Sequence, residues 1–169
     1  GYLMGAYARD KDAVEGYMMI LEMTAFYKKK GMTLSDALEK LYERYGLYGE
    51  RTIDVYMEGL DGIEKRRKLM SGLRDAAPIG FGGYAVTCIG DYKKGVFTDM
   101  KTGDETPTGQ GTSDVLYYIL ENGDKIVIRP SGTEPKVKFY ILAHAADKET
   151  LDSKISDYTQ DLRALTDKR

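Results

Sequence analysis

The stretch IVIRPSGTEPKVKFYI, residues 126–141, constrains the fold more than any other part of this sequence. Apolar side chains recur at every second position in both of its halves: Ile126 and Ile128, then Val137, Phe139 and Ile141. A two-residue period is typical of β-strands that bury one face. We therefore predict two neighbouring strands joined by the turn PSGTEP, with their apolar sides facing a layer of helices.

The other segments after Gly46 extend this pattern to an α+β domain. Strands are predicted at 51–58, 84–92, 115–129 (a hairpin around Asn122-Gly123) and 136–145, and helices at 61–73, capped by Asp61, and from Asp147 onward. Residues 101–114 have the composition of an exposed loop. This order of elements indicates an antiparallel sheet with two helices on one face.

Residues 1–48 have a helical pattern instead. Asp12, with Glu15 at capping-box spacing, is predicted to begin one helix, and Thr33 with Asp36 to begin a second. Both helices carry wide apolar stripes and have only each other to cover. We therefore interpret residues 1–48 as the helical remnant of an α/β domain and residues 49–169 as a separate domain.

Charge and cysteine content limit the class of protein. The formal net charge is -2, so there is no global attraction to nucleic acid or to an anionic membrane, and an anion site must be local. The single cysteine, Cys88, excludes an internal disulfide framework and fits a reducing, cytoplasmic location. No apolar run approaches the roughly 20 residues that span a bilayer. The sequence does not begin with methionine, so we expect residues to precede it.

The turn PSGTEP and its flanks concentrate groups that can bind an anion: Arg129, Ser131, Gly132, Thr133, Lys136 and Lys138. An arginine fork matches two phosphate oxygens, hydroxyls add donors, and a glycine allows backbone N–H groups to converge. Prolines at both ends of the turn lower the entropy lost on ligand binding. The same turn also fits an ordinary hairpin connection with solvated charges, and Glu134 would repel an anion if it pointed inward.

Other polar residues have simpler interpretations. His144 is expected to be structural or solvent-exposed, Cys88 to lie in the core, and the basic run 65–67 to be a solvated helix face. Two other classes of function are a nucleic-acid-binding platform and a purely structural module. The net charge and the acidic loop at 104–105 argue against the first.

Two motifs give a family resemblance. RPSGTEPK, Arg129 to Lys136, resembles the phosphate-binding loop in the last domain of the α-D-phosphohexomutases. GYLMG, Gly1 to Gly5, followed by RDKDAV, Arg9 to Val14, resembles the segment after the sugar-recognition loop in the third domain of that family. The form RPSGTEPKVKFY is most similar to bacterial phosphoglucomutases, a branch also related to phosphopentomutase.

The resemblance implies a fold, a reaction and partners. Residues 1–48 would be the end of domain 3, and residues 49–169 the TATA-box-binding-protein-like domain 4. The whole enzyme would convert glucose 1-phosphate to glucose 6-phosphate through a phosphoserine and glucose 1,6-bisphosphate, with Mg²⁺ held by aspartates of another domain. Phosphomannomutase and phosphopentomutase are the alternatives. The implied partners are a phosphosugar and the N-terminal domains of the same chain, with neither nucleic acid nor membrane.

The resemblance also assigns roles to residues. It implies that Arg129, Ser131, Gly132 and Thr133 bind the phosphate that does not react, that Lys138 assists them, and that Lys136 belongs to the same set. Lys11 would orient the sugar or assist proton transfer. The sequence lacks the family's catalytic-serine motif and an Asp-x-Asp-x-Asp metal loop. It is therefore expected to hold no metal site and to be inactive alone, with Asp10 and Asp12 acting as helix caps.

Overall fold

The computed structural model describes residues 4, 10–57, 59, 61–132 and 134–167. The chain divides into two compact units, Gly1–Gly46 and Leu47–Arg169. The first unit is helical, and the second contains the whole β-sheet.

The helical unit consists of α1 (Ala13–Lys29) and α2 (Leu34–Tyr45). The caps predicted at Asp12 and at Thr33 with Asp36 are confirmed: one Asp12 carboxylate oxygen accepts the N–H groups of Val14 and Glu15, and Thr33 and Asp36 form a reciprocal capping box. The cap predicted at Asp10 is wrong, because its carboxylate accepts the N–H of Lys11, which precedes the helix. The Glu15 carboxylate accepts the Met4 N–H at 3.0 Å. Short polar side chains therefore determine where both helices begin.

The apolar stripes of these helices are largely exposed to solvent. The large apolar side chains with the greatest exposure are Val14, Tyr17, Met18 and Phe26 on α1 and Leu38, Leu41 and Tyr45 on α2. No helix in the described part of the chain is sufficiently long and apolar to cross a membrane.

The second unit is built on an eight-stranded antiparallel sheet. Its strands are β1 (Leu47–Tyr56), β2 (Gly80–Phe81), β3 (Tyr84–Asp91), β4 (Val96–Asp99), β5 (Glu105–Pro107), β6 (Leu116–Leu120), β7 (Lys125–Pro130) and β8 (Lys136–Ala145). The strand order is β1-β8-β7-β6-β3-β4-β5, and β2 pairs with β3 outside this path. The hairpin predicted around Asn122-Gly123 is confirmed as β6 and β7.

The structure corrects three details of the predicted strands. β2 and β4 were not predicted, and β5 lies inside the segment predicted to be a loop. Strands of two to four residues are too short for a side-chain period to identify them. β1 begins at Leu47, before the predicted 51, because its first residues pair with the distant end of β8, where Leu47 lies opposite Ala145.

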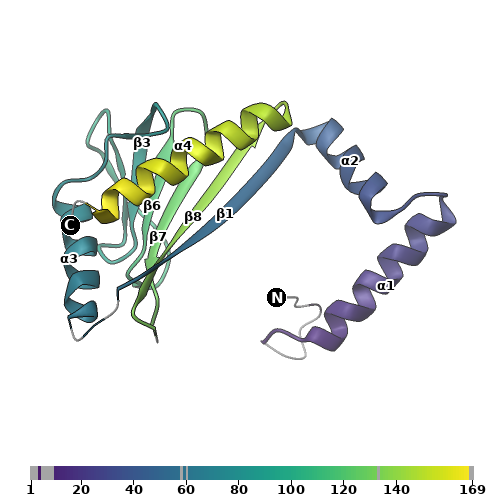
Figure 1. Ribbon diagram of the computed structural model, residues 1–169, viewed down its shortest axis with the longest axis horizontal. Coiled ribbons are helices and arrows are strands. Elements are labelled where there is room, and N and C mark those ends of the chain that lie inside the picture. Colours follow the sequence, from purple (N-terminus) through teal and green to yellow (C-terminus); the bar gives the residue numbers. More distant parts are fainter. Residues whose placement is uncertain (1–3, 5–9, 58, 60, 133, 168–169) are drawn as a thin grey trace. The chain divides into compact units, whose positions relative to one another are not determined.

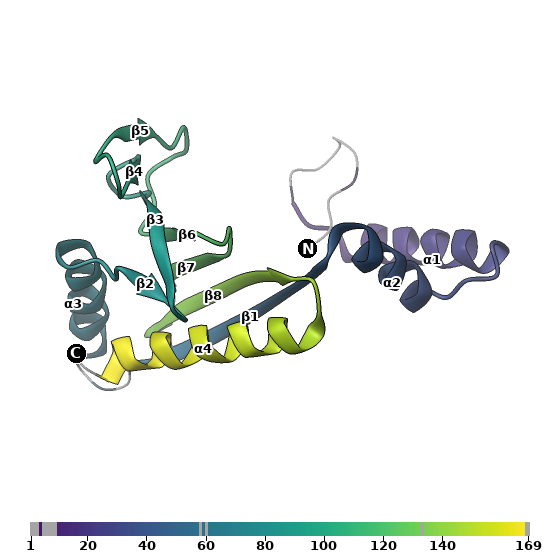
Figure 2. The same ribbon diagram turned by 90° about the horizontal axis from the view of Figure 1, so that it is seen from above.

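Two helices cover the same face of this sheet. α3 (Gly62–Asp75) contributes Leu69, Met70 and Leu73 to the core, and α4 (Lys148–Asp167) contributes Leu151, Tyr158 and Leu162. They pack with the alternate residues predicted to face helices, which are fully buried: Ile126, Ile128, Val137, Phe139 and Ile141. α4 lies along β1 and β8 (Figure 1), while β4 and β5 form the opposite edge of the sheet (Figure 2). The predicted α+β fold is confirmed.

Candidate functional site

The loop between β7 and β8 is held in shape by its own backbone hydrogen bonds. The Ser131 N–H donates to the Lys136 carbonyl, and the Lys136 N–H donates to the Glu134 carbonyl; the N···O distance is 2.8 Å in both hydrogen bonds. The N–H of Met57, just after β1, donates to the Pro135 carbonyl with an N···O distance of 2.7 Å. The Ser131 hydroxyl oxygen accepts the Glu134 N–H at 3.2 Å, which leaves its O–H group able to donate. Thr133, also predicted to bind phosphate, lies outside the described residues.

Beside this loop, Arg129, Lys138 and Asp54 form a row across three strands. Arg129 lies opposite Lys138, and Lys138 opposite Asp54. The Lys138 ammonium is 3.4 Å from Asp54 Oδ1, whereas Arg129 is exposed and has no acidic partner among the described residues. Like charges at opposite positions destabilise a sheet. Such a local conflict is expected at a functional site.

Lys136 is buried and its ammonium group is already occupied. Its Nζ lies 2.9 Å from Asp54 Oδ2 and 2.9 Å from Glu134 Oε2. Hydrogen bonds to Glu134 and then Asp54 raise the pKa of Lys136 despite its burial, and the bond from Lys136 lowers the pKa of Asp54. A direct bond from Lys136 to phosphate stays a prediction. In the structure its contacts fix the position of Glu134, the carboxylate that would otherwise oppose an anion.

Arg66 on α3 holds the loop from the side of the helices. Its Nη1 donates to the Ser131 carbonyl at 2.6 Å and to the Glu134 carbonyl at 3.2 Å. The interpretation of residues 65–67 as a solvated face is therefore wrong for Arg66. It holds for Lys65 and Arg67, which pair with Asp61 and Glu64 on the helix surface.

A sequence signal could have identified Arg66. Lys65 has an acidic residue four positions before it and Arg67 has one three positions before it, which are the spacings for ion pairs on a helix. Positions 62, 63, 69 and 70, the corresponding neighbours of Arg66, are all uncharged. An arginine without a helical partner is free to bind another element.

Gly132 lies in open space. Its φ is not in the positive range that favours glycine, so the predicted need for a special backbone conformation is not the reason for glycine here. A Cβ built at Gly132 would meet nothing within 4 Å. The protein's own packing therefore does not require glycine at this position, but a ligand that approaches the backbone closely would.

Asp10, Lys11 and Asp12 lie at the start of α1 in the helical unit. The Lys11 side chain is 75% exposed, and its ammonium is 3.6 Å from Asp10 Oδ1. The Asp10 carboxylate also accepts the Lys11 N–H at 2.7 Å. The predicted role of Lys11 toward a sugar stays a prediction, and its contacts are those of a solvated side chain.

The described residues contain no group of three or more His, Cys, Asp or Glu side chains that could hold a metal ion. Asp54 and Glu134, the carboxylates beside the loop, are both bonded to Lys136. A cation would have to displace that ammonium group. These two carboxylates therefore do not fit Mg²⁺.

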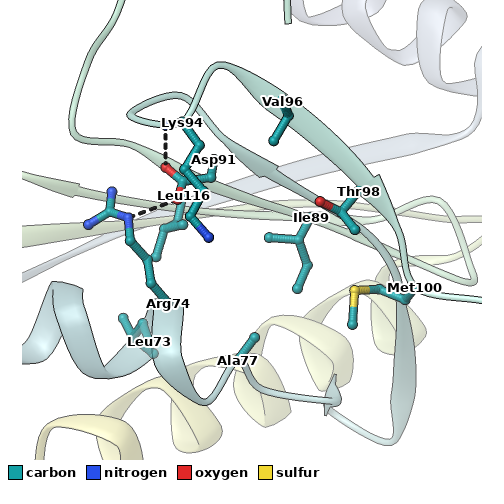
Figure 3. A pocket seen from close by; sticks show the side chains of 10 residues that line it. All are labelled: Leu73, Arg74, Ala77, Ile89, Asp91, Lys94, Val96, Thr98, Met100 and Leu116. Carbon is teal, nitrogen blue, oxygen red and sulfur yellow. Dashed lines mark hydrogen bonds and ion pairs between the residues drawn. The ribbon is translucent and has the colours of Figure 1, made fainter. Parts of the chain in front are cut away.

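A mainly apolar hollow of about 200 Å³ lies between α3 and the β3–β4 hairpin (Figure 3). Ile89 and Val96 line it, with Arg74 and Asp91 at its border. Arg74 bonds to Asp91 at 3.0 Å and to Asp114 at 2.5 Å. Because two carboxylates already balance this guanidinium, the hollow differs from the loop between β7 and β8, where Arg129 has no acidic partner among the described residues.

A buried polar cluster lies at the other end of β7. The Asp124 carboxylate is fully buried and accepts bonds from Tyr158 OH at 2.7 Å, Lys154 Nζ at 3.1 Å, and the His144 N–H at 3.0 Å. His144 Nδ1 is 2.8 Å from the same carboxylate, which confirms a structural position for this histidine. Burial alone would raise the pKa of Asp124, but these hydrogen bonds outweigh it and lower the pKa.

Cys88 is partly buried, and this burial raises the pKa of its thiol.

Comparison with known proteins places these features in a family. Residues 91–153 match the model of the phosphoglucomutase/phosphomannomutase C-terminal domain. A phosphoglucomutase from Staphylococcus saprophyticus is 35% identical over 140 residues, which cover 83% of this chain and 25% of that protein. A probable phosphomannomutase from Haemophilus influenzae is 32% identical over 166 residues, covering 98% of this chain and 31% of that protein.

A solved structure agrees with the fold. The open form of parafusin, a phosphoglucomutase from Paramecium, superposes with a TM-score of 0.55 and 13% identity, over 95% of this chain and 28% of that one. At this identity the likeness shows the fold alone. The chain thus spans about a quarter to a third of the length of these proteins.

Proposed function

Because this chain belongs to the phosphoglucomutase/phosphomannomutase family and matches its C-terminal domain, we propose that the loop between β7 and β8 binds the phosphate group of a phosphosugar. The observation that carries this proposal is the pairing of Arg129 with Lys138 at directly opposite positions. An anionic ligand would balance these two like charges.

The residues around the loop suit a phosphate ester. Arg129 offers a planar pair of N–H donors for two phosphate oxygens, and the Ser131 hydroxyl and Gly132 N–H add neutral donors. Four cationic side chains, Arg66, Arg129, Lys136 and Lys138, surround the loop against the two carboxylates of Asp54 and Glu134. The excess positive charge is local, which agrees with a chain whose net charge is -2.

In the complete enzyme, the loop would hold the phosphate that does not react while the other is transferred. Phosphoryl transfer depends mainly on positioning and charge stabilisation, and binding a remote phosphate supplies energy for that positioning. We propose glucose 1-phosphate and glucose 6-phosphate as the substrate pair, because the matched relatives include several phosphoglucomutases. A mannose phosphate is the second candidate, from the Haemophilus influenzae relative. Lys11 would orient the sugar.

A ligand titration tests the proposal. The ¹⁵N-labelled chain is titrated with inorganic phosphate and with glucose 1,6-bisphosphate, and the backbone amides of Arg129, Ser131 and Gly132 are followed by NMR. We expect these amides to shift with both ligands. Arg129→Ala should weaken binding by about 10- to 100-fold, because a hydrogen bond to a charged group contributes about 1.5–3 kcal/mol.

Arg51→Ala is the matched control, since Arg51 is an exposed arginine on β1. We expect it to bind both ligands as the wild type does. A wild-type chain without shifts in the loop would contradict the proposal, as would an Arg129→Ala variant that binds with unchanged affinity.

A further inference from the structure

We propose that Arg66 is a positioning residue of the loop, which turns the Gly132 N–H toward the bound phosphate. This inference rests on the proposed function of the loop. It gives a role to an arginine on α3 that lies 65 residues before Ser131 in the sequence.

The peptide group between Ser131 and Gly132 connects Arg66 to the site. The Ser131 carbonyl and the Gly132 N–H belong to this one planar group, which is trans, so the two point in opposite directions. The Arg66 guanidinium binds the carbonyl at 2.6 Å. It thereby directs the Gly132 N–H away from α3.

The Gly132 N–H is available on that other side. Within the described residues, no group accepts a hydrogen bond from it. A Cβ at Gly132 would meet nothing within 4 Å, so this part of the loop is open. A backbone donor that is fixed and unpaired before binding loses little entropy when an anion arrives.

The start of α3 is packed so that Arg66 reaches the loop. A Cβ at Gly62 would lie 2.0 Å from the Met57 carbonyl oxygen and 3.7 Å from Pro135 Cβ. Glycine therefore lets the first turn of α3 approach the backbone after β1 and the end of the loop. Arg66 is four residues further on, so it lies on the same face of the helix. The Met57 N–H bond to the Pro135 carbonyl joins the same two segments.

Arg66 differs from Lys65 and Arg67 in the groups that its side chain binds. Lys65 and Arg67 pair with carboxylates one turn away on α3. Arg66 instead uses Nη1 to bridge two backbone carbonyls, those of Ser131 and Glu134. A charge-assisted bond to a carbonyl is stronger than a neutral one. The arrangement therefore stabilises one orientation of the loop, and Arg67 provides a matched control.

The test compares Arg66→Ala with Arg67→Ala in the ¹⁵N-labelled chain. Dissociation constants for inorganic phosphate and glucose 1,6-bisphosphate are measured together with the free energy of unfolding in urea. We expect Arg66→Ala to weaken binding about tenfold, since the loop must be ordered again on binding. We expect Arg67→Ala to bind as the wild type does. At saturation the ligand-induced shift of the Gly132 amide should be smaller in Arg66→Ala, while the Arg129 amide still shifts.

The outcomes separate this inference from the proposed function. A wild-type chain that binds neither ligand contradicts the proposed function. If the wild type and Arg67→Ala bind, an Arg66→Ala variant with wild-type affinity and a wild-type Gly132 shift overturns the inference alone. Should Arg66→Ala be unfolded, Arg66→Met keeps the bulk of the side chain without its donors. A loss of affinity in Arg66→Met that its unfolded fraction fully explains would also overturn the inference.

Discussion

The two ends of strand β7 use charged residues in opposite ways. At its start, the buried Asp124 carboxylate is surrounded by Tyr158, Lys154 and His144, which bind it directly. At its other end, Arg129 is exposed beside another cation, without an acidic partner among the described residues. Asp124 immediately precedes β7 and Arg129 is its fifth residue, so only residues 125–128 separate the two sites.

The difference separates a structural cluster from the proposed binding site. A buried charge is tolerated when every partner is supplied by the protein, and the resulting network joins the strands to α4. Two cations at opposite positions destabilise a sheet, and of this pair only Lys138 has an acidic partner, Asp54, among the described residues. This arrangement is consistent with a site whose partner comes from outside. The three predictions below test this contrast, beginning with the largest expected effect.

Asp124→Ala should destabilise the sheet unit by about 3 kcal/mol, because removing one side of a buried charged network leaves the other groups without a partner. Urea unfolding followed by circular dichroism measures this loss. Asp152→Ala, at an exposed position of α4, is the control and should change little. An Asp124→Ala variant as stable as the control would contradict the structural role of the Asp124 cluster. A folded Asp124→Ala variant that binds phosphate less tightly than the wild type would contradict the separation of this cluster from the loop.

Lowering the pH should reduce the free energy of unfolding, because it protonates the Asp124 carboxylate. Its pKa is lowered in the folded state, since the hydrogen bonds outweigh the effect of burial. Its stabilising contribution is therefore complete above the ordinary aspartate pKa of about 4 and is lost as the pH falls through the lower folded-state value. One such proton changes the free energy of unfolding by at most about 1.4 kcal/mol per pH unit.

Urea unfolding of the wild type and Asp124→Asn at a series of pH values measures this contribution. The difference between the two proteins should shrink as the pH falls below about 5. Other carboxylates with lowered pKa, such as Asp54 and Asp147, titrate equally in both proteins. A difference that stays constant down to pH 2 would show that Asp124 does not carry the effect.

The smallest effect is expected at the loop. Gly132→Ala should leave stability unchanged or raise it by up to about 1 kcal/mol, because the added Cβ meets open space and the unfolded chain loses freedom. It should nevertheless weaken phosphate binding about fivefold, equivalent to one hydrogen bond of about 1 kcal/mol. Isothermal titration calorimetry measures the affinity.

Gly111→Ala is the matched control for this change. Gly111 also has open space around a built Cβ and no positive φ. It should gain similar stability and keep full affinity for phosphate. Equal affinities in both glycine variants would mean that no ligand approaches the backbone at Gly132.

The sequence was sufficient for the strands that bury one face, and insufficient wherever a residue acts through a distant partner. The alternation in 126–141 correctly predicts β7, β8 and their buried side, because that period is local. The partners of Asp124 come from β8 and α4, and no local pattern links them. Likewise, the contacts of Arg66 and Lys136 with the loop and with Asp54 depend on how α3 and β1 pack. The residue types of the turn were enough to predict an anion-binding loop, but the contacts of Arg66 and Lys136 that hold the loop in shape could not be predicted from them.

The excess of two cations around the loop has a consequence for ligand choice. A phosphate monoester carries two negative charges only above its second ionisation, near pH 6. Lysine and arginine keep their charge throughout this range. Between mildly acidic and neutral pH, the affinity should therefore follow the ionisation of the ligand, and the loop should prefer a dianionic ester over a singly charged sulfate ester of the same sugar.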